Sequence, residues 1–126
     1  MVASKFDISK NNISLIELYS VAKSDIKIYI SSESINHINN SRKYLEDKLN
    51  NINELIYGVN TGFGSLCDKK IDFDDIEQLQ ENLVNSHDCG VGEDVPHLIK
   101  KLIFLIKIRS LSFGFSGIRN VVVERL

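Results

Sequence analysis

The sequence predicts an α+β fold that is mainly helical, with one or two short strands near the N-terminus. A strand is predicted at residues 26–31, IKIYIS, where apolar and polar residues alternate. Helices are predicted where apolar residues recur at helical spacing between asparagine, glycine and proline positions. The chain has 126 residues, 43% hydrophobic and 25% charged, which fits one globular domain.

Two helices are predicted in the first half of the chain. The first covers residues 15–23, where Ser14 and Glu17 have the spacing of a capping box. The second begins at Ser32 and ends in the asparagine-rich segment 49–54, because asparagine side chains compete for backbone hydrogen bonds. Its apolar stripe consists of Ile35, Ile38, Leu45 and Leu49.

Three further helices are predicted in the second half. Asp72 is expected to cap one helix, and Pro96 suits the first turn of another that stops at Gly114. The last is expected to begin near Ser116 and to reach the final residue without a C-cap. Because of that ending, and because residues 102–106 are apolar nearly all round, we expect a longer natural protein or packing between copies. The face expected for the Asp72 helix consists of Phe73, Ile76, Leu79 and Leu83.

The charge balance argues against several classes of partner. The net charge is −2, from 15 basic and 17 acidic residues, so neither nucleic acid nor an anionic membrane is expected. The apolar run 102–106 is too short to span a membrane, and the N-terminus lacks the apolar segment of a secretory signal. Cys67 and Cys89 make no disulfide framework, and a cytoplasmic location is expected.

The segment YGVNTGFG, residues 57–64, places three glycines and a tyrosine in one loop. It lacks the Gly-Lys-Ser/Thr of a phosphate-binding loop and the third glycine of a dinucleotide fingerprint. Glycines let a backbone approach a ligand or move as a hinge, and Tyr57 could act there as an acid or a base. The alternative is a tight surface turn with Tyr57 packed beneath it.

A second glycine loop follows in NSHDCGVG, residues 85–92. His87 is predicted at the C-terminal end of a helix, where it could hold a carboxylate, share a proton or simply cap the helix. His87, Cys89 and His97 could also be considered as metal ligands, but their spacing is unusual for zinc and a fourth ligand is not evident. We therefore predict no metal site.

The two loops together resemble a known family. Three segments in this order resemble the first part of the aromatic amino-acid ammonia-lyases: YGVNTGFGSLCDKKI, LQENLVNSHDCGVGE and GFSGIRNVVVERL. That family includes histidine, phenylalanine and tyrosine ammonia-lyases and related aminomutases. The resemblance extends from about residue 12 to residue 126. It implies residues 1–95 as an N-terminal domain carrying the tyrosine loop, and 96–126 as the start of a central helical domain.

The resemblance also implies roles for particular residues. Tyr57 would be the base that removes the substrate β-proton, on a mobile loop whose closure depends on Gly58, Gly62 and Gly64. His87 and Asn60 would bind substrate. The pair Ser86-His87 fits the histidine branch, whose reaction eliminates ammonia from L-histidine to give urocanate. A lyase or aminomutase acting on tyrosine or phenylalanine is the alternative.

Two departures from the family pattern bear on activity. The family forms its electrophile, 4-methylidene-imidazol-5-one (MIO), from an internal Ala-Ser-Gly, and this chain has none. We therefore expect the 126-residue chain alone to be inactive. Lys107 and Arg109 stand where the family usually has Arg and Asn, so hydrogen bonding should differ there.

The resemblance leaves the biological role of a short chain open. As part of a longer enzyme, it would act on a small amino acid and assemble as a homo-oligomer, without nucleic acid or membrane partners. The alternative is a non-catalytic interaction module derived from the same family.

Overall fold

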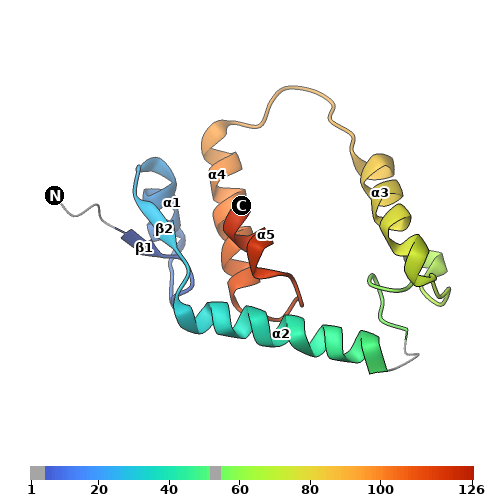
Figure 1. Cartoon of the computed structure of the whole chain (residues 1–126). Helices are drawn as coiled ribbons and strands as arrows, with labels where there is room; N and C mark the ends of the chain where they lie inside the picture. The colour runs from blue at the N-terminus through green and yellow to red at the C-terminus, as the bar shows by residue number, and fades with distance from the viewer. Residues whose placement is uncertain (1–4, 52–54) are drawn as a thin grey trace. The chain divides into compact units, whose positions relative to one another are not determined.

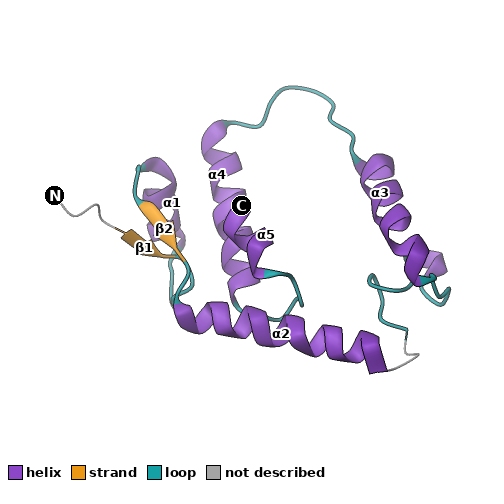
Figure 2. Ribbon diagram, viewed as in Figure 1, coloured by secondary structure: helices purple, strands orange, loops and turns teal. Residues whose placement is uncertain are grey.

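The computed structural model describes residues 5–51 and 55–126 (Figure 1). They fall into two compact units. Unit 1 comprises the described part of Met1–Asn50 together with Asp94–Leu126, and unit 2 comprises the described part of Asn51–Glu93. The predicted mainly helical fold with short strands is confirmed (Figure 2).

The elements follow in one order along the chain. Apart from the last residue of α2, unit 1 contains β1 (Lys5–Asp7), α1 (Leu15–Lys23), β2 (Lys27–Tyr29), α2 (Ser32–Asn51), α4 (His97–Ser112) and α5 (Asn120–Arg125). Unit 2 contains two 3-10 turns, η1 (Gly64–Leu66) and η2 (Phe73–Asp75), and the helix α3 (Ile76–His87).

The two strands form a small parallel sheet, with α1 in the connection between them. Lys5 pairs with Lys27, and Asp7 pairs with Tyr29. The predicted strand at residues 26–31 is confirmed as β2. The sequence did not locate β1, because three residues are too few to display an alternating pattern.

The core of unit 1 forms where α1 packs against α4. The buried apolar side chains are Ile8, Leu18, Val21, Ala22, Ile38, Leu105, Ile108, Leu111 and Val123. They come from both ends of the sequence, so the N-terminal segment and α4 depend on each other for burial. Each large aliphatic side chain contributes about 1.5–3 kcal/mol when buried.

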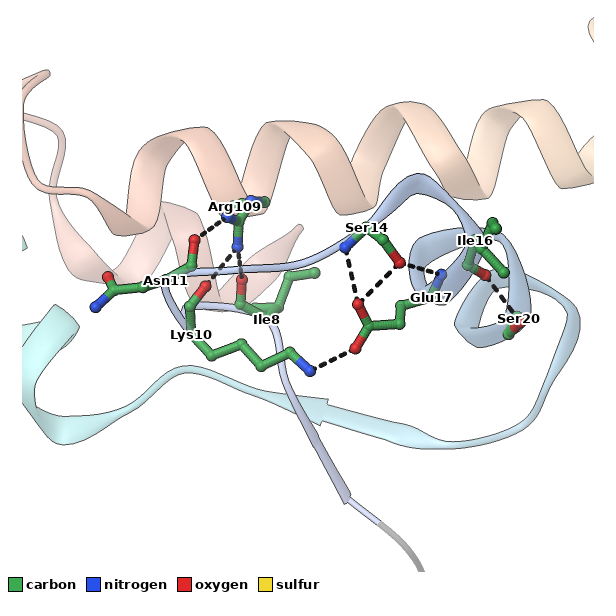
Figure 3. Close-up of polar contacts among 8 residues, drawn as sticks. All are labelled: Ile8, Lys10, Asn11, Ser14, Ile16, Glu17, Ser20 and Arg109. Atoms are coloured by element: carbon green, nitrogen blue, oxygen red, sulfur yellow. Dashed lines mark hydrogen bonds and ion pairs between the residues drawn. The ribbon is translucent and has the colours of Figure 1, made fainter.

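The predicted capping box at the start of α1 is confirmed (Figure 3). The Ser14 Oγ atom accepts a hydrogen bond from the Glu17 amide at 3.2 Å, and the Ser14 amide donates to Glu17 Oε2 at 2.8 Å. Lys10 Nζ lies 2.7 Å from the other carboxylate oxygen, Oε1. These contacts satisfy amides that otherwise lack partners at a helix N-terminus.

The predicted boundaries of two helices were wrong. Residues 73–75 form a 3-10 turn, so α3 begins at Ile76 with Asp75 at its N-cap, and Asp72 instead accepts the Asp75 amide on its carbonyl oxygen. The helix α5 begins at Asn120, not near Ser116. The reason is Gly117, whose left-handed φ of 65° cannot continue a helix.

The other helices agree with the sequence patterns. The helix α2 begins at Ser32 as predicted, and Ile38 from its apolar stripe is buried. The helix α4 ends just before Gly114, which has a left-handed φ of 73°. No helix among the described residues is both long and apolar enough to cross a bilayer.

Candidate functional site

The candidate site in unit 2 centres on the tyrosine loop, defined here as residues 56–64. A tight turn starts the loop. The amides of Val59 and Asn60 donate to the Ile56 carbonyl oxygen at 3.0 and 3.2 Å. The Asn60 side chain closes the same turn, because its Oδ1 accepts the Ile56 amide at 2.6 Å.

The base of the tyrosine loop is anchored to residues 69–71. Thr61 and Lys70 form an antiparallel bridge. The Gly62 amide donates to the Lys69 carbonyl oxygen at 3.1 Å, and the Ile71 amide donates to the Asn60 carbonyl oxygen at 3.0 Å. The loop is therefore an ordered turn with its own backbone pairing.

Two glycines are required by this geometry. Gly58 has a φ of 74°, a left-handed conformation that costs other residues free energy. At Gly62, a Cβ atom would lie 2.6 Å from the Leu66 Cβ, so a side chain cannot fit without a shift. Gly64 also has a positive φ, 57°, and begins η1.

Tyr57 lies on the outside of the loop. Its side chain is 64% exposed, so it is not packed beneath the turn. The ring makes an edge contact with Phe63, with centroids 6.3 Å apart and planes at 77°. This aromatic contact supports one side of the ring and leaves most of the residue open to a ligand.

His87 is the last residue of α3, as predicted, and is exposed. Its Nδ1 atom lies 3.0 Å from the Leu83 carbonyl oxygen and 3.0 Å from Ser86 Oγ. A hydrogen bond to the carbonyl requires a proton on Nδ1, which leaves Nε2 as the second ring nitrogen for another partner. The local contact is that of a helix-capping histidine.

The structure places Tyr57 and His87 in different parts of unit 2. The anchor at 69–71 lies directly before η2 and α3, whereas His87 ends α3, a helix of 12 residues. At 1.5 Å per residue, that helix is roughly 18 Å long. The tyrosine loop contains Tyr57 together with Gly58, Asn60, Gly62 and Gly64. His87 lies outside this loop.

The described residues hold no group of three or more His, Cys, Asp or Glu side chains that could bind a metal ion. Cys67 and Cys89 are exposed free thiols.

Residues 13–126 match the sequence model of the family described as aromatic amino acid lyase. The chain belongs to this family. The sequence is 40% identical over 116 residues to a histidine ammonia-lyase of Geobacillus sp. (strain WCH70), a match that covers 92% of this chain and 23% of that enzyme. The resemblance expected from the two loops is thereby confirmed.

Solved structures of aromatic amino acid lyase relatives share the fold. An ergothionase from Treponema denticola superimposes with a TM-score of 0.88 and 27% identity, over 97% of this chain and 24% of that one. A phenylalanine aminomutase from Pantoea agglomerans gives a TM-score of 0.86 and 29% identity, over 97% and 23%. The chain thus spans about a quarter of the length of these relatives.

The 126 residues of this lyase-family chain contain no Ala-Ser-Gly. Its Ser-Gly pair, Ser116-Gly117, follows Phe115 and not alanine. The Gly117 amide donates to Ser41 Oγ at 3.1 Å in a turn of unit 1.

The sequence patterns missed the two side chains that shape the tyrosine loop. Thr61 is fully buried, and its hydroxyl donates to the Gly62 carbonyl oxygen at 2.9 Å. Phe63 supports the Tyr57 ring. Neither residue has a spacing that predicts a role, although threonine hydroxyls in turns can bond to nearby backbone groups.

Proposed function

We propose that the chain is the N-terminal portion of a histidine ammonia-lyase-like enzyme, which eliminates ammonia from L-histidine without oxidation to give urocanate. The observation that carries this proposal is the 40% identity to a histidine ammonia-lyase over 92% of the chain. The exposed Tyr57 on a glycine-rich loop held by hydrogen bonds supports it. In this proposal residues 1–95 belong to an N-terminal domain and residues 96–126 begin a central helical domain.

The catalytic role of the chain falls on Tyr57. Its phenolate would take the β-proton of the substrate as a general base, with positive charge or hydrogen bonds in the complete site favouring the phenolate. His87 is proposed to bind substrate through Nε2. Asn60 is proposed to bind substrate as well, and its Oδ1 also accepts the Ile56 amide.

The electrophile must come from outside this chain. Because Ala-Ser-Gly is absent, the 126-residue chain alone is proposed to be inactive. The cytoplasmic location stays a prediction.

The test is a graft in which residues 13–126 replace the matching segment of the Geobacillus histidine ammonia-lyase. We expect ammonia release and urocanate formation from L-histidine. Tyr57→Phe should lower the turnover by a factor of about 10² or more, the scale of a lost general base. Tyr44→Phe is the matched control, since Tyr44 is equally exposed at 64% and lies on α2.

Parallel assays with L-phenylalanine and L-tyrosine test the alternatives. Conversion of either one in preference to histidine would favour a lyase or aminomutase of different specificity. The similarity to the phenylalanine aminomutase from Pantoea agglomerans is the reason to test this alternative. A folded graft that acts on none of the three would support the non-catalytic interaction module instead. Urocanate production by the 126-residue chain itself would contradict the missing electrophile.

A further inference from the structure

We propose that Asn60 and Thr61 are positioning residues that fix the backbone of Tyr57 from both sides. The inference rests on the proposed function only in calling Tyr57 the base. It concerns the backbone amides of Ile56 and Gly58, the residues on either side of Tyr57, and it gives the Asn60 side chain a role within the loop.

The two side chains accept hydrogen bonds from the backbone amides of Ile56 and Gly58, the residues before and after Tyr57. Asn60 Oδ1 accepts the amide of Ile56 at 2.6 Å. Thr61 Oγ1 accepts the amide of Gly58 at 3.3 Å and donates its own proton to the Gly62 carbonyl oxygen at 2.9 Å. The hydroxyl of Thr61 thus uses its donor and an acceptor site at once, which defines its rotamer.

Burial makes these contacts hard to replace by water. Asn60 is 8% exposed and Thr61 is fully buried, whereas Tyr57 between the paired amides is 64% exposed. A buried polar group that loses its partner retains the cost of desolvation. The side chains therefore hold the turn from inside while the tyrosine ring remains outside.

The backbone conformation explains why Tyr57 needs such support. Gly58, directly after it, has a left-handed φ of 74°, and glycine loses the most conformational freedom on folding. The hydrogen bond from the Gly58 amide to Thr61 favours one conformation of this flexible position. The edge contact of Phe63 with the Tyr57 ring then completes the placement.

The consequence for catalysis is preorganisation. A general base must lie within hydrogen-bond reach of the proton that it removes, so small changes in its position lower the rate. In this loop, Ile56–Gly62 would move as one turn, and the side chains of Asn60 and Thr61 would keep Tyr57 in place during any closure.

The test uses the 126-residue chain with 3-fluorotyrosine at its four tyrosines and ¹⁹F NMR. Tyr57→Phe identifies the Tyr57 signal. The signals of Tyr19, Tyr29 and Tyr44, all in unit 1, are internal controls. Thr61→Val removes the hydroxyl, and Thr61→Ser keeps it.

We expect Thr61→Val to shift or broaden the Tyr57 signal and to raise the amide exchange rate at Gly58 roughly tenfold, the scale of one net hydrogen bond. Thr61→Ser should restore both. Asn60→Leu should act in the same way at the Ile56 amide, and Asn60→Asp, which keeps an acceptor oxygen, should restore it. In every variant, the amides of α3 should keep their protection.

Two results would overturn the proposal. One is an unchanged Tyr57 signal in Thr61→Val and Asn60→Leu. The other is loss of α3 protection together with the Tyr57 shift, which would make both residues general supports of unit 2. None of these measurements uses lyase activity, so failure of the graft would refute the proposed function without affecting this result.

Discussion

Arg109 of α4 donates a hydrogen bond from Nη1 to the carbonyl oxygen of Lys10 at 2.7 Å (Figure 3). The same guanidinium also donates to the carbonyl oxygens of Ile8, at 3.3 Å, and Asn11, at 2.9 Å. The Cζ atom of Arg109 lies over the Phe113 ring, 5.3 Å from the centroid. One cation thus fixes the segment between β1 and α1 to a helix almost a hundred positions later in the sequence.

Replacing Arg109 by Asn, the residue that the family resemblance implies at this position, should destabilise unit 1. Hydrogen bonds from a charged donor contribute about 1.5–3 kcal/mol, and asparagine is too short to reach three carbonyl oxygens. We expect a loss of about that size in the free energy of unfolding by urea. Arg109→Lys should restore only part of it, because an ammonium lacks the planar fork. Lys107→Asn, at an exposed position of the same helix, is the control; an equal loss there would contradict the role of Arg109.

The capping carboxylate of α1 should make this helix sensitive to acid. The hydrogen bond from Lys10, followed by those from Ser14, lowers the pKa of Glu17 from its usual 4.5 to about 2. A lowered folded-state pKa means that stability from Glu17 is complete above pH 4.5 and is lost as the pH falls through about 2. Glu17→Gln should therefore reduce the loss of stability in that window. Glu33→Gln, in the first turn of α2, should leave it as in the unchanged chain. Equal effects of the two variants would refute the assignment.

Two glycines with left-handed backbone allow a matched comparison. At Gly114 a Cβ atom would lie 2.6 Å from the backbone carbonyl carbon of His37, whereas at Gly117 it would meet the flexible end of Leu45 at 2.8 Å. Both substitutions to alanine carry the cost of a left-handed conformation, about 1–2 kcal/mol. Gly114→Ala should cost at least about 1 kcal/mol more, because backbone cannot move aside as a side chain can. Urea unfolding of both variants tests this; equal losses would show that α2 yields at His37.

The apolar face of α4 should drive self-association of the 126-residue chain. Ile99, Ile103 and Ile106 are exposed at 44, 57 and 49%, and an apolar patch of this kind commonly marks an interface. We expect dimers or larger oligomers by light scattering at micromolar concentration. Ile103→Asp should shift the chain to monomer while circular dichroism shows unchanged helix. A monomeric chain before any substitution would contradict the prediction.

Local sequence patterns predicted most of the helices and strands, because hydrophobic periodicity and helix caps depend on a few neighbouring residues. Ser14 and Glu17 predicted the start of α1 without any tertiary information. Contacts between distant segments could not be predicted: Leu105 was one residue of an apolar run with no assigned partner, and the structure buries it in the core with residues of α1. Likewise, the sequence marked Arg109 only as a departure from the family pattern, because its three carbonyl partners lie in a distant segment.

The candidate site shows the same division. Tyr57 and its glycines could be selected from the sequence, since their chemistry and backbone freedom belong to the residue types. The inward orientation of Asn60 could not, because it depends on a bond to the Ile56 amide in a turn whose geometry no spacing defines. The substrate-binding role that the family resemblance implies for Asn60 stays a prediction, and the structure adds a hydrogen bond from the Ile56 amide to its Oδ1.

The division of unit 1 between two stretches of sequence has a consequence for synthesis on the ribosome. The chain leaves this unit at residue 50 and returns at residue 94, so α1 has no partner helix until α4 has been translated and has left the exit tunnel. Closing such a long loop has an entropic cost and makes folding slower. Until then, the nascent N-terminal segment stays unfolded with its apolar side chains exposed to water, where a chaperone can bind them. A chain terminated after residue 93 should show no protection of the α1 amides from hydrogen exchange; strong protection there would mean that α1 folds without α4.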